Sequence, residues 1–351
     1  MSDNKQFNND GVDITAQDFQ EHEEHHSPPT PPKKRKFPWI KAAVLLIAAG
    51  AIFLGMGLAS GARGGYISWA GGNLTFNVNN ADEIYSQIAL ADVTNIEIAT
   101  GSASITVVRA NSFLLEFIGI EPDYSIENGH LTIDYRPSFS GFQVLSFGLT
   151  NSRQEIIVHL PRDIIYNLDL TTSSGRITVE GVELYDAELR TSSGRLLMDN
   201  VIVQNLETRT SSGRMRLDNV TAQNLNARTS SGRFTAENLM AQNAHVRSSS
   251  GALRIDGLEF GSIGIESSSG SIRVQNARSN GPGEANLRAS SGSIRFEIAD
   301  RAEDYGYILT SSSGSIRFNG ERLRDGGNIL GGPGSISAHT NSGSIRITSL
   351  H

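Results

Sequence analysis

The chain has 351 residues, a formal net charge of −7, 36 glycines and no cysteine. The absence of cysteine excludes disulfide bonds, thiolate metal sites and a lipid-modified cysteine anchor. The net negative charge argues against a dedicated nucleic-acid-binding protein, so no nucleic-acid partner is expected.

The two kinds of basic residue are unevenly distributed. All five lysines precede residue 42, and every formal cation beyond that point is an arginine. The chain therefore has two chemically distinct regions, which meet near residue 41.

Residues 1–36 are expected to form a disordered cytoplasmic tail. The first 32 residues hold seven acidic residues, one lysine and few apolar residues, and they end in SPPTPP. Such a segment cannot bury enough apolar surface to offset the entropy lost on folding. The sequence EHEEHH at Glu21–His26 implies no fixed geometry, so no metal site is predicted there.

Residues 37–62 are expected to form a transmembrane helix. Ala42–Ala62 is a run of 21 uncharged residues, about the length that crosses a roughly 30 Å hydrocarbon core. Five cations precede this run, and Arg63 follows it. The positive-inside rule then predicts a single-pass cell-membrane protein with a cytoplasmic N-terminus and an extracellular C-terminal domain. A cleaved signal peptide ending near LASGA is the alternative, but the long preceding tail and the long apolar run favour a retained anchor.

A repeat occupies the C-terminal half. The glycine of each Ser-Ser-Gly recurs every 19 residues, at positions 175, 194, 213, 232, 251 and 270, and returns at 292, at 314 and, as Asn-Ser-Gly, at 343. A fixed period near 20 is typical of a solenoid in which each unit stacks on the previous one.

The apolar residues show that the coils are strands. In the unit Thr172–Arg190 they fall in pairs at 177 and 179, 182 and 184, and 187 and 189. A spacing of two indicates strand alternation, and the step of three between pairs indicates a corner. Residues 171–351 are therefore predicted to form an all-β, single-stranded β-solenoid, similar to a parallel β-helix, with coils of about 19 residues.

Two residue types are expected at the corners. Gly175 and its equivalents would adopt positive φ angles. Asn200, Asn219 and Asn238 would tolerate the left-handed region, and stacked asparagines such as Asn205, Asn224 and Asn243 would bond from coil to coil.

Residues 63–170 are expected to form an irregular β capping region before the solenoid. Within it, Asn95–Val108 has the pattern of a degenerate coil, and Tyr124–Tyr135 has that of a hairpin around Asn128-Gly129. At the other end, the last coil is expected to be the free tip, with Arg346 near its edge discouraging self-association.

The segment Glu155–Val182, EIIVHLPRDIIYNLDLTTSSGRITVEGV, resembles the bacterial "putative adhesin" family of β-strand-repeat envelope proteins. In that family a strand ending in Leu-Pro precedes serial Ser-Gly coils. The resemblance covers roughly residues 95–351 and implies a β-solenoid on the outer face of the membrane. The chain departs from the family in having arginine, not an acidic residue, after many of the glycines.

Charged residues recur in columns on the outward positions. We define the first arginine column as Arg176, Arg195, Arg214 and Arg233, and the second arginine column as Arg190, Arg209, Arg228 and Arg247. In later coils the first column moves two residues on, to Arg254, Arg273, Arg295, Arg317 and Arg346. An acidic column that could compensate it comprises Glu180, Asp199, Asp218, Glu237, Asp256 and Glu297.

Both arginine columns are candidates for binding a repeating polyanion, because guanidinium groups bind phosphate and carboxylate in a bidentate manner. The second column has less obvious acidic partners and is the better candidate. The expected ligands are an anionic cell-wall polymer, such as a teichoic acid or an acidic polysaccharide, or lipid head groups.

The predicted function is that of a non-enzymatic, membrane-anchored cell-envelope protein, an adhesin-like scaffold or binding module with no catalytic residues, cofactor or metal. One alternative is a polysaccharide-active β-helix enzyme, but such an enzyme needs a pair of carboxylates, and the acidic residues here repeat without a singular pair. The other alternative is a purely structural spacer or an accessory protein of an envelope-stress system.

Overall fold

A computed structural model describes strands at 62–70, 73–80, 84–86 and 142–148, together with residues 93–118, 122–135, 154–162, 164–323 and 326–350. The chain divides into two compact units, Met1–Phe53 and Leu54–His351, and the described residues belong to the second. The expected tail at 1–36 and membrane helix at 37–62 lie outside the described residues, apart from Ala62. No helix within the described ranges is long and apolar enough to cross a membrane.

Three strands form a small antiparallel sheet with the order β2-β1-β9. They are β1 (Ala62–Ala70), β2 (Asn73–Asn80) and β9 (Phe142–Gly148). This sheet lies within the segment that the sequence assigns to the irregular capping region.

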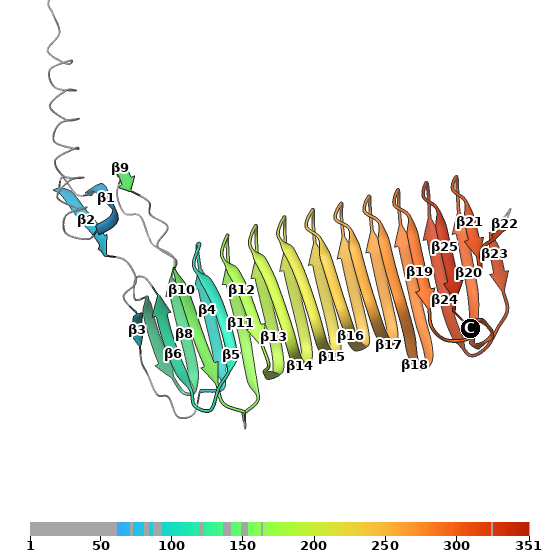
Figure 1. Cartoon of the computed structure of the whole chain (residues 1–351), viewed down its shortest axis with the longest axis horizontal. Helices are drawn as coiled ribbons and strands as arrows, with labels where there is room; N and C mark the ends of the chain where they lie inside the picture. Colours follow the sequence, from blue (N-terminus) through green and yellow to red (C-terminus); the bar gives the residue numbers. More distant parts are fainter. Residues whose placement is uncertain are drawn as a thin grey trace, which may run out of the picture. The chain divides into compact units, whose positions relative to one another are not determined.

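Within the part of the chain that the structure describes, 22 further strands are joined in one continuous sheet. Its central strands stack in parallel with an offset of 19 residues, so that Arg195 lies beside Arg214 and Thr210 beside Thr229 (Figure 1). The strands that succeed one another here are β11 (Tyr166–Thr172), β12 (Arg176–Glu180), β13 (Glu183–Thr191), β14 (Arg195–Thr210), β15 (Arg214–Thr229), β16 (Phe234–Ser248), β17 (Leu253–Ser267), β18 (Ile272–Ala289) and β19 (Ile294–Ile298). The predicted all-β solenoid with 19-residue coils is confirmed.

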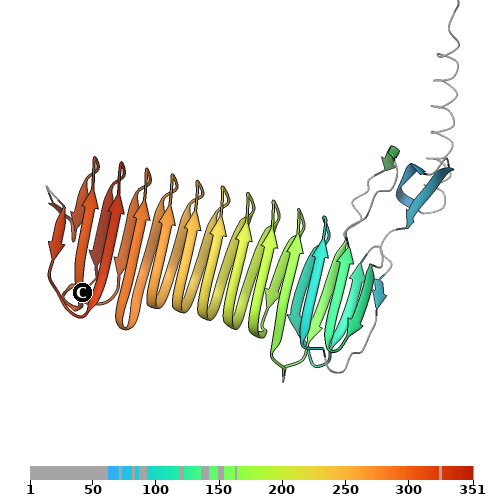
Figure 2. The same ribbon diagram turned by 180° about the vertical axis from the view of Figure 1, so that it is seen from behind.

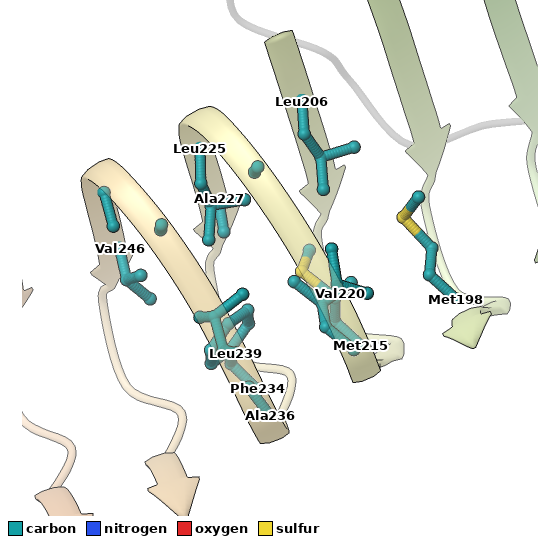
Figure 3. Close-up of a cluster of buried hydrophobic side chains, with 14 of the residues drawn as sticks. Met198, Leu206, Met215, Val220, Leu225, Ala227, Phe234, Ala236, Leu239 and Val246 are labelled. Carbon is teal, nitrogen blue, oxygen red and sulfur yellow. The ribbon is translucent and has the colours of Figure 1, made fainter. Parts of the chain in front are cut away.

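The core lies inside the coils. All six apolar positions predicted for the unit Thr172–Arg190 are buried, and so are their equivalents in the following four coils. Figure 3 shows this interior, where Val220 and Leu239 occupy equivalent positions of successive coils. Each buried residue therefore packs against its own counterpart in the next coil, which is the reason for the regular sequence.

Asparagine serves at two corners, as predicted. Asn200, Asn219 and Asn238 have φ angles of 54°, 53° and 53°, in the left-handed region that asparagine tolerates. At the other corner the amide of Asn243 donates to Asn224 Oδ1 at 3.0 Å, and that of Asn224 donates to Asn205 Oδ1 at 2.8 Å.

The glycines of the Ser-Ser-Gly turns have a different role from the predicted one. Gly175 and its equivalents are not among the described residues with positive φ, so that prediction is wrong. They are required by close packing instead. A Cβ atom at Gly213 would lie 1.8 Å from the carbonyl oxygen of Gly194, and one at Gly194 would lie 1.7 Å from that of Gly175.

The order of coils departs from the order of the sequence at both ends. The first coil, formed by β4 (Asn95–Thr100) and β5 (Ser104–Arg109), lies between β8 (His130–Tyr135) and β10 (Glu155–Leu160) on one side and β11 and β12 on the other. The last segment of the chain, β24 (Gly334–Thr340) and β25 (Ile345–Ser349), lies between β18–β19 and β20–β21 (Figures 1 and 2). The prediction that the final coil is a free tip is therefore wrong.

Antiparallel strands flank both ends of the stack. At one end β6 pairs with β10 and with β3, and β7 pairs with β8 through the predicted hairpin at Asn128-Gly129, whose φ angles are 50° and 76°. At the other end β23 pairs with β20, and β22 with β21. These pairings occupy the edges that would otherwise template association with another chain. The end strands are β3 (Ile84–Ser86), β6 (Leu114–Ile118), β7 (Asp123–Glu127), β8 (His130–Tyr135), β10 (Glu155–Leu160), β20 (Tyr305–Ser311), β21 (Ile316–Phe318), β22 (Glu321–Leu323) and β23 (Gly327–Ile329).

The close approach of the turn glycines gives a test of the fold. We expect Gly213→Ala to lower the free energy of unfolding by about 1–3 kcal/mol, because neighbouring backbones must separate to admit the methyl group. Gly306→Ala is the matched control, since its Cβ would have no neighbour closer than 3.7 Å. Chemical denaturation measures both variants. Equal stability of the two would show that the turns do not pack this tightly.

Candidate polyanion-binding site

Each coil turns at Thr-Ser-Ser-Gly or a close variant, and the turn places two serines on the surface. The buried hydroxyl of Thr191 accepts a hydrogen bond from the amide of Gly194 at 3.0 Å, and Thr210 does the same for Gly213. The turns form a row of narrow loops along the long sheet (Figures 1 and 2). We call the exposed serine pairs of this row the serine ridge: Ser173 and Ser174, Ser192 and Ser193, Ser211 and Ser212, Ser230 and Ser231, Ser249 and Ser250, Ser268 and Ser269, and Ser290 and Ser291.

The second arginine column is in register along the strands that precede the turns. Arg190, Arg209, Arg228 and Arg247 lie side by side on successive coils. The column continues through Glu266, Arg288 and His339. Sequence reasoning missed Arg288 because an insertion stretches its unit, although it also precedes a Ser-Ser-Gly.

A groove runs between this column and the serine ridge. It has a volume of about 890 Å³ and is lined by the second arginine column, by Arg288 and His339, and by the first serine of successive turns. The acidic residue in its lining is Glu266. We call it the arginine groove. Its walls repeat a guanidinium group and a hydroxyl group at the spacing of the coils.

Most arginines of the second column have acidic partners, contrary to the expectation from the sequence. Arg190 pairs with Glu188 and, at 3.3 Å, with Asp169. Arg209 Nε donates to Glu207 at 2.8 Å, and Arg247 lies 3.0 Å from Glu266.

Arg228 differs from its neighbours because its Nε donates to a neutral group, Asn226 Oδ1, at 3.3 Å. The arginines of the column that form ion pairs remain 40–49% exposed, so these pairs contribute little stability. Their effect is to hold the guanidinium groups in place along the groove.

The first arginine column lies on the strands that follow the turns. Its four members are in register and exposed, and none forms an ion pair with a described residue. The expected compensation by the acidic column is therefore wrong for these four. Members of the acidic column do pair with Arg216, which contacts Asp218 and, at 3.5 Å, Glu237.

A second groove, of about 860 Å³, follows the asparagine corner. We call it the asparagine groove. Its ladder of amides extends from Asn243 to Asn205, whose amide donates to Asp186 at 2.7 Å. Glu188, Glu207, Asn226, His245 and Asn286 also line it. The sequence indicated the ladder but not the groove, because a concave surface depends on the angle between two faces of the coil.

His245 is the most perturbed side chain of the asparagine groove. Burial lowers the pKa of its imidazole, and the nearby guanidinium of Arg247 lowers it further, against an opposing effect of Glu266. Its Nε2 atom is buried and has no hydrogen-bond partner among the described residues. The neutral form is therefore favoured in the folded protein.

The histidines and acidic residues do not gather at one place. His130 lies 3.4 Å from Glu97, and His159 lies 3.3 Å from Glu116. Within the described ranges, no group of three or more His, Asp or Glu side chains is arranged to hold a metal ion.

The fold and these surfaces define a class of protein, a β-solenoid whose polar side chains repeat in columns along stacked coils. A family model described as Toastrack DUF4097 matches residues 85–348, and the chain belongs to this family. The resemblance to bacterial "putative adhesin" proteins is thereby confirmed. No curated protein matches the chain significantly.

Solved structures resemble the chain at low sequence identity. A putative adhesin from Bacteroides fragilis NCTC 9343 is 14% identical, with a TM-score of 0.41, over 76% of this chain and 97% of that chain. A putative lipid binding protein from Parabacteroides distasonis ATCC 8503 is 16% identical, with a TM-score of 0.36, over 77% of this chain and 97% of that chain.

The lowered pKa of His245 predicts a pH dependence of stability. Below about pH 6.5 the unfolded chain takes up a proton at this histidine that the folded protein does not. The contribution of His245 to stability is therefore lost as the pH falls below about 6.5. In His245→Asn, the difference between the free energies of unfolding at pH 7.5 and pH 5 should shrink. Chemical denaturation at the two pH values measures it, and an unchanged difference would contradict the assignment.

Proposed function

We propose that this protein is a non-enzymatic, adhesin-like binding module of the cell envelope. Residues 37–62 anchor it in the cell membrane, residues 1–36 lie in the cytoplasm, and the solenoid lies outside. The 21 uncharged residues Ala42–Ala62, with basic residues before them, support the anchor and its orientation. The family resemblance supports the adhesin-like role.

The arginine groove is the observation that carries the binding function. It repeats the same donors, a guanidinium and a serine hydroxyl, on successive coils. Arginine binds phosphate and carboxylate with two parallel hydrogen bonds. A polymer with regularly spaced anionic groups can therefore bind along the coils, and the acidic partners of Arg190, Arg209 and Arg247 keep the donors oriented.

The same groove offers less to a polysaccharide-active enzyme. Glycoside hydrolysis requires two carboxyl groups about 5–10 Å apart in the substrate cleft. The described lining of the arginine groove holds one, Glu266, and that carboxylate is paired with Arg247 at 3.0 Å. Binding without chemistry is the function that this arrangement supports best.

Neutralising the second arginine column tests the proposal. The variant Arg190→Gln, Arg209→Gln, Arg228→Gln and Arg247→Gln should lose affinity for purified cell wall by at least tenfold, because it loses the guanidinium donors of the groove. Co-sedimentation of the full-length chain in a nonionic detergent, across a salt series, measures the affinity. Binding by the native chain should weaken as the salt concentration rises.

A control variant makes the same change of charge outside both grooves, with glutamine at Arg109, Arg278, Arg301 and Arg322. Its binding should be close to that of the native chain. Absence of cell-wall binding by the native chain at low salt would contradict the proposal and leave a structural spacer as the function.

The orientation in the membrane can be tested independently of binding. Because the chain has no cysteine, one introduced cysteine is a specific label site. We expect a membrane-impermeant maleimide to label Ser212→Cys, in the serine ridge, on intact cells. Ser2→Cys should be labelled only after the cells are permeabilised. Labelling of Ser2→Cys on intact cells would overturn the proposed orientation.

A further inference from the structure

Five arginines form a continuous column on the last coils of the solenoid. Each lies two residues beyond the position of the first arginine column, and each is in register with the next. We call this column the arginine ladder. In spatial order its members are Arg254, Arg273, Arg295, Arg346 and Arg317, and Arg322 lies beside Arg317 on the antiparallel strand β22.

The ladder exists because the chain turns back on itself. Arg346 is last in the sequence, but it lies between Arg295 and Arg317, since β25 lies between β19 and β21 (Figure 1). Arg346 is therefore the neighbour of both Arg295 and Arg317. The fold thus places five cations on five neighbouring coils, about 4.8 Å apart along the stack.

The ladder has little compensating charge. None of the five arginines forms an ion pair or a side-chain hydrogen bond with a described residue, and four of them are exposed while Arg295 is half-buried. The acidic column, two residues further along each strand, is reduced here to Asp256 and Glu297. Neutral residues stand at the other three positions, namely Gln275, Thr348 and Asn319.

A column of serines accompanies the ladder on the same face of the sheet. Ser271, Ser293, Ser344 and Ser315 each lie two residues before an arginine. Together with four of the ladder's arginines they line a depression of about 310 Å³, whose described lining contains no carboxylate. Guanidinium groups only donate hydrogen bonds, so the site favours a ligand whose groups are ionised acceptors.

We infer that the arginine ladder is a binding site for a linear phosphate-bearing polymer that lies along the solenoid axis. A single row of cations matches a chain of phosphates, whereas a membrane surface would require cations spread over a plane. The tetrahedral oxygens of a phosphate can accept from a guanidinium and from the neighbouring serine hydroxyl. Binding also removes the repulsion between the stacked cations. This site is separate from the arginine groove, because it lies on the strands that follow the turns.

The test uses the full-length chain in a nonionic detergent and fluorescein-labelled linear polyphosphate as the probe. Fluorescence anisotropy measures the affinity at two salt concentrations. Glutamine at all five ladder positions should lower the affinity at least tenfold and weaken its salt dependence. A control with glutamine at Arg109, Arg162, Arg278 and Arg301, which lie off the ladder, should bind as the native chain does. The unfolding midpoint of the ladder variant should be unchanged or higher, since it removes a repulsion.

The spatial order of the ladder gives a sharper test. Arg346→Glu places a negative charge inside the column, while Arg254→Glu places the same charge at its end, where the next coil has Thr235. We expect Arg346→Glu to weaken polyphosphate binding more than Arg254→Glu does. The opposite order would show that the ligand does not follow the stacked coils.

Three other results would overturn the inference. In the first, the ladder variant binds polyphosphate with the same affinity as the native chain. In the second, polyglutamate binds as well as polyphosphate, and in the third, micelles containing phosphatidylglycerol compete more strongly than unlabelled polyphosphate. The variant of the second arginine column separates this inference from the proposed function. It should retain polyphosphate binding at the ladder even if its cell-wall binding is lost.

Discussion

The close contact of glycine backbones at the turns is the constraint on which the rest of the surface depends. Each turn packs so tightly on the previous one that a Cβ atom at Gly213 would lie 1.8 Å from the Gly194 oxygen. The preceding threonine is buried and holds the turn through the glycine amide. The two serines between the threonine and the glycine are then exposed, and the arginines before and after each turn recur at fixed positions along the stack. The functional surface is thus a consequence of backbone packing.

Repetition explains why the arginine columns differ in their partners. Two residues apart on a strand lie on the same face, so Glu188 and Glu207 meet Arg190 and Arg209 directly. The acidic residues beyond the first column are four residues away, and Arg176 and Arg195 therefore reach none of them. The spacing sets which residue lies beside each arginine, and the residue type at that position then decides the pairing, since Arg228 has Asn226 there and Arg247 pairs with Glu266 of the next coil.

The periodicity of the sequence predicts the structure of each coil well. Strand alternation, corners and the left-handed asparagines such as Asn200 could be predicted because each is a local property of a few neighbouring residues. The close packing that requires glycine at each turn could not be predicted, because it depends on the distance between two coils. One of the two acidic partners of Arg190, Asp169, could not be predicted for the same reason, since it lies in the previous coil, whereas Glu188 lies two residues away on the same face.

The ends of the solenoid show the limit of local reasoning most clearly. A stack of parallel strands leaves an open edge at each end, and antiparallel pairing at that edge requires the chain to reverse direction. At the C-terminal end, β20–β21 and their antiparallel partners precede β24–β25 in the sequence, but β24–β25 lie further inside the stack. Insertions obscure this order in the sequence, where Arg317 precedes Arg346. A ligand along the ladder would therefore recognise an order of residues that exists only in the folded protein.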